Sequence, residues 1–254
     1  MFLTATISSL LDKERLDVAL VKLKLVNTRQ IALSTIISGK VFIDDKKILK
    51  AGTIVKKNSL IKVRKREYEW VSRGGLKLSP VLKKFKIILK NKICLDIGSS
   101  TGGFTDVLLK EGALRVYCVD VGYGQLAWKI RNDKRVVVLE KTNARYLNSN
   151  QINQLVQVLV CDVSFISIKK IIPACLKFLS KDAYLIVLIK PQFEAGKENI
   201  SKGGIIKNDK IHKIVCDDIK QWFIEQLNKE VISIIESSIK GQKGNKEFFI
   251  LAKN

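Results

Sequence analysis

The alternation of short apolar segments with helical segments between residues 93 and 189 constrains the fold of this chain most strongly. Segments typical of strands cover 93–97, 115–120, 136–139, 156–162 and 184–189. Helical patterns follow residue 103, lie near residue 125, and cover 166–179 and 209–226, with two last strands at 231–235 and 247–252. Such alternation produces a mostly parallel sheet with helices on both faces. We therefore predict an α/β domain with a Rossmann-like sheet.

The first 66 residues follow a different pattern, typical of a small α+β unit. Apolar positions recur at helical spacing over 15–25, and a second helix is expected between the N-cap Thr28 and the terminator Gly39. Short strands are expected at 41–43 and 60–63, around a polar turn at 44–47. Residues 1–14 are interpreted as an N-terminal extension. A charged run at 64–69 reads as a linker, so we predict domains at 1–66 and 67–254.

The charge of the chain points to a polyanionic partner. Lys and Arg number 46 and Asp and Glu 24, which gives a net charge of +22. Residues 1–90 hold 21 basic and 7 acidic residues, so the excess is concentrated near the N-terminus. This asymmetry favours a nucleic-acid-binding surface there. Apolar runs such as 183–189 are far shorter than the ~20 residues of a membrane-spanning helix, so no integral membrane association is expected.

The cysteines and the histidine exclude several classes of site. The five cysteines are scattered without CxxC spacing, which is typical of reduced core residues in a cytoplasmic protein. His212 is the only histidine. A histidine-based metal site and a Ser-His-Asp triad are therefore not expected.

A glycine-rich turn follows the first strand of the α/β domain. Residues 96–104 place Asp96, Gly98, Gly102 and Gly103 between a strand and a helix, without the GxGxxG spacing of dinucleotide sites. Asp120 ends the next strand, where a carboxylate accepts hydrogen bonds from ribose hydroxyls. A cofactor with adenosine but no diphosphate, S-adenosylmethionine (SAM), fits this pattern. The alternative is a tight turn that holds no ligand.

Two further charged residues end strands of the same sheet. Asp162 and Lys190 follow the fourth and fifth strands, at the carboxyl edge where α/β folds bind ligands. A lysine at the end of a buried strand is costly without a partner carboxylate. The pair therefore indicates either a reactive site or a structural ion pair.

Ordered motifs along the chain resemble the TlyA family of ribosomal RNA 2'-O-methyltransferases, whose catalytic domain is FtsJ-like. These motifs cover 71–77, 96–105, 120–126, 142–145, 162–167, 190–194 and 244–247. The N-terminal unit resembles an S4 RNA-binding domain through 15–17, 28–29 and 39–41, although residues 43–45 depart from its usual turn. The resemblance extends over residues 15–252.

The resemblance implies that the chain transfers a methyl group from SAM to the 2'-OH of cytidine in ribosomal RNA. The implied catalytic residues are Lys77, Asp162, Lys190 and Glu247. Lys190 would activate the hydroxyl, Asp162 and Glu247 would hold Lys190 in place, and Lys77 would stabilise the developing alkoxide. No metal is required, and the expected partners are ribosomal RNA and ribosomal subunits.

The resemblance also implies two binding sets. The cofactor would be surrounded by Asp96, Gly98, Gly102, Gly103, Asp120 and Asn143. Phosphates of the RNA would be contacted by Arg15, Arg29, Lys40, Lys50, Arg64, Lys65 and Arg66. Each basic residue has the alternative of being only a solvated charge.

Two other functions are compatible with parts of this pattern. Members of the family are also labelled haemolysins, which raises the alternative of a membrane-active protein. A second alternative is a non-catalytic RNA-binding protein on an inactive methyltransferase fold. The complete set of four catalytic residue types argues against the second alternative.

Overall fold

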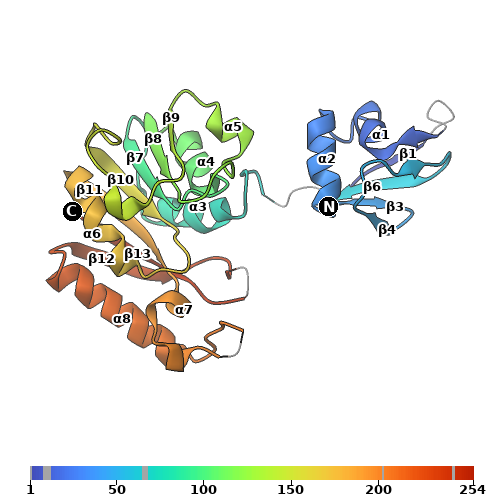
Figure 1. The fold of residues 1–254 in the computed structure, drawn as a ribbon. Coiled ribbons are helices and arrows are strands. Elements are labelled where there is room, and N and C mark those ends of the chain that lie inside the picture. The colour runs from blue at the N-terminus through green and yellow to red at the C-terminus, as the bar shows by residue number, and fades with distance from the viewer. Residues whose placement is uncertain (1, 8–12, 65–67, 202, 242–243) are drawn as a thin grey trace. The chain divides into compact units, whose positions relative to one another are not determined.

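The chain forms two compact units, Met1–Glu69 and Trp70–Asn254. The computed structural model describes residues 2–7, 13–64, 68–201, 203–241 and 244–254 (Figure 1). The predicted domain boundary between residues 66 and 67 lies outside these described residues. Each unit is described by itself below.

Within its described residues, the N-terminal unit combines two helices with small antiparallel sheets. Its helices are α1 (Leu16–Lys22) and α2 (Arg29–Ile37). One sheet has the order β1-β6-β3-β4, with β1 (Phe2–Thr6), β6 (Leu60–Arg64), β3 (Val41–Ile43) and β4 (Lys46–Ile48). A second sheet pairs β2 (Glu14–Arg15) with β5 (Ile54–Val55). The predicted helix N-cap is confirmed, because Thr28 Oγ1 accepts a hydrogen bond from the Ile31 amide at 3.2 Å.

Two details of this unit differ from the sequence-based interpretation. Residues 2–6, predicted as an extension, pair with β6 as an edge strand. In this strand Ala5 is half-buried and the other four residues are exposed. The strand therefore lacks the alternation of buried apolar and exposed polar residues by which a strand can be predicted. The turn before β4 is shorter than predicted and consists of Asp44 and Asp45, both with positive φ (48° and 64°). Aspartate tolerates this conformation, which matches the twist of a two-residue hairpin.

The C-terminal unit is built on a seven-stranded sheet, which confirms the predicted α/β class. The strand order is β12-β13-β11-β10-β7-β8-β9. The parallel strands are β7 (Ile93–Ile97), β8 (Arg115–Val119), β9 (Val136–Leu139), β10 (Val156–Cys161) and β11 (Leu179–Ile189). The last two strands, β12 (Glu230–Glu236) and β13 (Phe248–Lys253), join antiparallel beside β11. The carboxyl ends of the parallel strands therefore meet at one edge.

Helices connect and cover this sheet (Figure 1). They are α3 (Gly74–Lys84), α4 (Gly103–Lys110), α5 (Trp128–Arg131), α6 (Ile172–Cys175), α7 (Pro191–Glu194) and α8 (Asp209–Glu225). The described part of this unit also contains the 3-10 segments η2 (Ala144–Tyr146), η3 (Ile168–Lys170), η4 (Leu176–Phe178) and η5 (Lys197–Asn199). The helix predicted over 166–179 is wrong as one element, since η3, α6 and η4 divide it. Pro173 contributes to the division, because proline lacks the amide of a continuous helix and favours its first turn.

The core of the C-terminal unit lies on both faces of the sheet. On one face, Leu95 and Ile97 of β7 pack with Cys175 of α6 and with Ile219 and Phe223 of α8. On the other face, the ring of Phe104 in α4 lies 6.0 Å from that of Phe249 in β13. Among the described residues, no helix combines the length and apolar composition that a membrane crossing requires.

Candidate active site

The glycine-rich turn lies between β7 and α4, at the carboxyl edge of the sheet. Gly98 has a φ of +79°, and a Cβ there would lie 2.6 Å from the carbonyl oxygen of Asp162. A Cβ on Gly103 would lie 2.2 Å from Ser72 Oγ and 3.1 Å from the Cα of Gly74. Glycine at these two positions lets the turn approach β10 and lets α4 begin directly against the start of α3. This second approach brings Lys77, on the first turn of α3, towards the end of β10 and the start of β13.

Asp120 follows β8 and ties the neighbouring loops together. Its Oδ2 accepts a hydrogen bond from the Ser100 amide at 2.8 Å, and its Oδ1 accepts one from the Gly122 amide at 2.7 Å. Each carboxylate oxygen has two lone pairs, so both can accept a second hydrogen bond. Asp120 can therefore support the turn and still bind the hydroxyls of a ribose.

Four charged side chains from distant parts of the sequence form one continuous cluster. Lys190 Nζ lies 2.6 Å from Asp162 Oδ1, and Lys77 Nζ lies 3.3 Å from Asp162 Oδ2. Glu247 Oε2 lies 2.8 Å from Lys77 Nζ. The order of contacts is thus Lys190, Asp162, Lys77, Glu247. The expectation that Glu247 holds Lys190 is wrong for the contacts in this structure, because its carboxylate pairs with Lys77.

This cluster is enclosed by protein. The side chains of Lys77 and Lys190 are 9% and 8% exposed, and that of Glu247 is 3% exposed. Asp162 Oδ1 and Glu247 Oε2 are close enough for ion pairs, but their angles do not meet hydrogen-bond geometry. A buried ammonium without a carboxylate partner is strongly unfavourable. The alternation of two lysines with two carboxylates provides the required compensation.

A cavity of about 600 Å³ opens onto the cluster. All four clustered residues line it, together with Gly98, Ser99, Ser100, Thr101 and Gly103 of the glycine-rich turn. Such a volume is within the usual range for small-molecule and cofactor sites. The turn and the charged cluster therefore face the same space.

Asp96 does not line this cavity, in contrast to its predicted place beside the cofactor. It is fully buried, and its Oδ2 lies 2.6 Å from Thr105 Oγ1. Burial raises the pKa of Asp96 to about 7, and the hydrogen bond from Thr105 opposes this rise. Asp96 therefore supports the glycine-rich turn through its contact with Thr105 in α4.

Three other residues of the predicted cofactor set also lie outside the lining of the cavity, namely Asp120, whose contacts are given above, and Gly102 and Asn143. Gly102 precedes α4 with a φ of +89°, and a Cβ there would lie 3.0 Å from Leu126. Asn143 caps η2, where its Oδ1 accepts a hydrogen bond from the Arg145 amide at 3.1 Å. Both residues shape the loops around the carboxyl edge.

Several lining residues were not singled out from the sequence. Ser164 Oγ accepts a hydrogen bond from Lys190 Nζ at 2.7 Å. Phe165 is 86% exposed, has a φ of +64°, and lies 5.1 Å from the ring of Phe193. Asn245 bonds to the carbonyl of Gly204 and the amide of Ile206. These residues lie within or beside the quoted motifs 162–167, 190–194 and 244–247, and only tertiary contacts distinguish them from their neighbours.

In the N-terminal unit, Arg15 and Arg29 converge on one buried carboxylate. Arg15 Nε lies 3.0 Å from Asp17 Oδ1, and Arg29 Nε lies 2.7 Å from Asp17 Oδ2. The arginine side chains are 50% and 61% exposed, whereas that of Asp17 is 0% exposed. Hydrogen bonds from Arg15 and then Arg29 lower the pKa of Asp17, although burial opposes them. Each guanidinium has five N–H donors, so donors remain for a phosphate.

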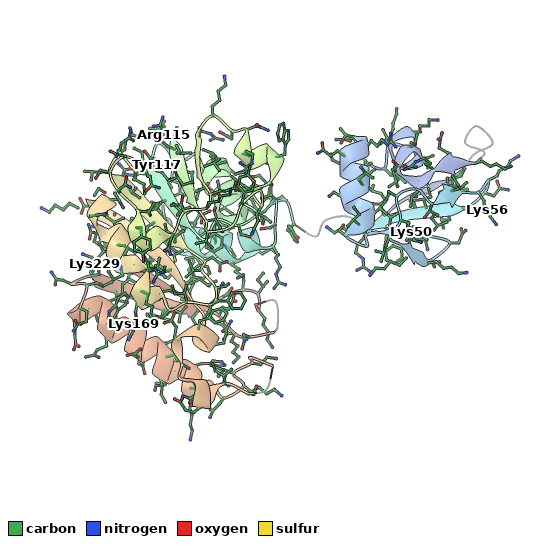
Figure 2. The ribbon with its side chains drawn as sticks, in the orientation of Figure 1. Lys50, Lys56, Arg115, Tyr117, Lys169 and Lys229 are labelled. Carbon is green, nitrogen blue, oxygen red and sulfur yellow. The ribbon has the colours of Figure 1, made fainter. Side chains whose placement is uncertain are left out.

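The other predicted RNA contacts occupy varied positions. Lys50 is exposed, as is Lys56, and Figure 2 shows both on the N-terminal unit. Arg64 is exposed at the end of β6, where its guanidinium lies 5.5 Å and 5.6 Å from the rings of Phe2 and Phe42. Lys40 is half-buried between α2 and β3. Lys65 and Arg66 lie outside the described residues.

The sequence and structure are similar to those of known proteins. Residues 70–254 match the FtsJ-like methyltransferase family, and residues 14–61 match the S4 domain. The 16S/23S rRNA (cytidine-2'-O)-methyltransferase TlyA of Mycobacterium tuberculosis is 41% identical, over 94% of this chain and 89% of that protein. Hemolysin A of Brachyspira hyodysenteriae is 45% identical, over 87% of this chain and 92% of that protein. A solved structure named as a hemolysin from Streptococcus thermophilus has a TM-score of 0.73 at 38% identity, covering 96% of this chain and 89% of that chain.

Proposed function

The chain belongs to the FtsJ-like methyltransferase family, in the group that includes TlyA, and we propose that it transfers a methyl group from SAM to the 2'-OH of cytidine in ribosomal RNA. The enclosed cluster of Lys190, Asp162, Lys77 and Glu247 carries this proposal, because it faces a cavity shared with the glycine-rich turn. Two relatives bear the name hemolysin, but the cluster has the residue types that a hydroxyl methyl transfer requires.

The residues at the turn fit SAM. The cavity is large enough for a nucleoside-sized ligand, and the first turn of α4 presents backbone N–H groups that suit a carboxylate. Asp120 would accept hydrogen bonds from the ribose, while Gly98 and Gly103 allow close approach of the backbone. SAM supplies a methyl group made electrophilic by its sulfonium. Asp96, Gly102 and Asn143 would then act by holding the surrounding loops.

The cluster provides the groups needed to activate a ribose hydroxyl. A 2'-OH is a weak nucleophile, and a neutral lysine amine beside it can accept its proton. Asp162 contacts Lys190 and Lys77 together, so it fixes the spacing of the two amino groups. Lys77, held by Glu247, would stabilise negative charge that develops on the attacking oxygen. The enclosed setting excludes water and strengthens these interactions.

The N-terminal unit would bind the RNA. Arg15 and Arg29 are held by Asp17 with donors still available, which suits bidentate contacts to phosphates. Phosphate contacts position a protein on RNA without reading its sequence. The ribosomal subunits are the proposed partners, which places the reaction in the cytoplasm.

Ribose methylation can be mapped in ribosomal RNA from cells with the gene, without it, and without it but carrying a Lys190→Ala copy. We expect 2'-O-methylcytidine at specific positions only in cells with the unaltered gene. Methylation that persists at every position in the deletion strain would overturn the proposal. Leakage from liposomes that is equally strong with the unaltered protein and with Lys190→Ala would instead support a membrane-active function.

A further inference from the structure

The amino group of Lys190 has two oxygen neighbours of different chemistry in the structure. Asp162 Oδ1 lies 2.6 Å away as an ion-pair partner whose angle does not meet hydrogen-bond geometry, whereas Ser164 Oγ accepts a hydrogen bond at 2.7 Å. Asp162 belongs to the four-residue cluster described above, whereas Ser164 lies outside it. Both residues follow β10, two positions apart, and both line the cavity.

The number of hydrogens on the lysine nitrogen explains how the contact with Ser164 can orient the amino group. A neutral amine has two N–H groups and one lone pair, arranged tetrahedrally with the bond to Cε. The ion pair with Asp162 alone would leave the amino group free to rotate about the Cε–Nζ bond. The hydrogen bond to Ser164 fixes one N–H group, and the negative charge of Asp162 favours the second N–H group on its own side. The two contacts together therefore determine where the lone pair points.

The loop that carries Ser164 is fixed on both sides. The Asp162 amide donates to the carbonyl of Ile97 at 2.9 Å. Beyond Ser164, the carboxylate of Glu194 accepts hydrogen bonds from Ser167 Oγ at 2.6 Å and from the Ile168 amide at 2.9 Å. The positive φ of Phe165, inside this loop, is an unfavourable conformation that such anchors can maintain. Ser164 is thus held at a set position relative to Lys190.

We propose that Ser164 is a positioning residue that orients the amino group of Lys190 towards the 2'-OH of the RNA. Its hydroxyl accepts one N–H of Lys190 while the charge of Asp162 attracts the other, and the lone pair then faces the cavity. In the step itself, the hydroxyl proton moves to the Lys190 nitrogen as the ribose oxygen bonds to the methyl carbon and the carbon–sulfur bond breaks. This inference rests on the proposed function, in which Lys190 accepts that proton.

The test compares Ser164→Ala with Ser164→Thr in the full-length protein. Removal of the hydroxyl should lower kcat about 10- to 100-fold, since a small misplacement of a reacting group has effects of this size. The KM values for SAM and for RNA should change less than about 2-fold, because the contact acts on the chemical step. Ser164→Thr retains a hydroxyl and should restore most of the activity.

A serine at the amino end of β11 provides a matched control. Ser180→Ala removes the same atom from a half-buried position on β11, and should leave kcat unchanged. Because Ser164 is an exposed residue, its substitution should also leave the thermal unfolding temperature close to that of the unaltered protein. A large loss of stability in Ser164→Ala would show a structural role and overturn the inference.

A double variant separates this inference from the proposed function. If Ser164 acts through Lys190, then Ser164→Ala should cause no further loss of kcat in a Lys190→Ala background. An equal further loss in that background would show that Ser164 acts independently, which contradicts the inference. Unchanged kcat in Ser164→Ala, with Lys190→Ala inactive, would reject the role of Ser164 and leave the proposed function intact. An active Lys190→Ala protein would reject the proposed function itself.

Discussion

The two units of the chain each gather basic side chains around carboxylates, but they enclose them to very different degrees. In the N-terminal unit, one buried carboxylate, Asp17, holds Arg15 and Arg29 whose side chains are at least half exposed. In the C-terminal unit, Lys77 and Lys190 are themselves enclosed, and Asp162 contacts both of them while Glu247 contacts Lys77. The first arrangement presents charge to a partner, and the second removes charge from water.

This difference matches the chemistry of the residues. Arginine is always protonated and offers a fork of donors, so a buried carboxylate can orient it while leaving donors for a phosphate. Lysine can lose its proton when its surroundings favour the neutral form. The exposed cluster, formed by Arg15 and Arg29 around Asp17, is therefore suited to binding RNA. The enclosed cluster that contains Lys77 and Lys190 is suited to catalysis. Variants in one cluster should leave the function of the other largely intact.

The largest effect is expected at Lys190. Lys190→Ala should lower kcat by ~100-fold or more, because positioned proton transfer contributes 10²- to 10⁴-fold. Lys190→Arg keeps the charge but cannot release a proton at ordinary pH, so it should be almost as inactive. Single-turnover methyl transfer measures this loss, and calorimetry should show SAM affinity nearly unchanged. A folded, active Arg variant would contradict proton transfer by Lys190.

A smaller effect is expected when Asp120 is replaced. Asp120→Ala should weaken SAM binding by about 1–3 kcal/mol, the usual result of losing hydrogen bonds to an ionised group. Part of this loss would come from the turn, since Asp120 also accepts from the Ser100 amide. Calorimetry with Asp182→Ala as a control should show the difference, because Asp182 is an exposed residue in β11. Equal affinities for the two variants would remove Asp120 from the cofactor site.

The exposed cluster can be tested without removing any arginine. Asp17→Asn should weaken RNA binding by ~10-fold, since charged hydrogen bonds that orient the two arginines are worth about 1.5–3 kcal/mol. Asp45→Asn makes the same change of charge at an exposed position of the same unit. If Asp17 acts only by reducing positive charge, both variants should bind RNA more tightly. Filter binding at several salt concentrations distinguishes these outcomes.

A further effect concerns the pH dependence of stability. Burial raises the pKa of Asp96 to about 7 from a usual value of 3.8, so the folded state holds this proton more tightly than the unfolded state does. This contribution to stability is complete below about pH 3.8 and is lost as pH rises through about 7. Asp96→Asn should therefore gain stability relative to the unaltered protein between pH 4 and 8. Urea unfolding curves at several pH values test this, and a constant difference would exclude the raised pKa.

Most of the fold could be predicted from the sequence, because apolar strands and glycine turns are local signals. Four of the five parallel strands lie within one residue of their predicted limits, whereas β11 begins at Leu179 instead of residue 184, and Thr28 caps α2. Strand β1 could not be predicted, since its pairing with β6 is a long-range contact and its side chains are mostly exposed. Pairing Glu247 with Lys77 likewise depends on α3, a helix that was not predicted.

The sequence predicted which residue types form the candidate site, but it did not predict which of these side chains contact one another. The motifs supplied Asp162 and Lys190 at strand ends, where a parallel sheet must bring them together. The motifs could not show that the Asp96 side chain contacts Thr105 instead of the cavity. The direction in which a side chain points at the end of a strand depends on how the strand packs in the folded protein. Ser164 could not be distinguished either, since its contact with Lys190 requires the loop after β10 to be folded.

In the proposed reaction, an enclosed lysine activates a ribose hydroxyl of RNA held by the other unit. The purified protein can be incubated with ribosomal subunits and isotopically labelled SAM, and the RNA then digested to nucleosides for mass analysis. We expect labelled 2'-O-methylcytidine with the unaltered protein and none with Lys190→Ala. Label on a nucleobase, or equal ribose labelling by both proteins, would contradict the proposed reaction.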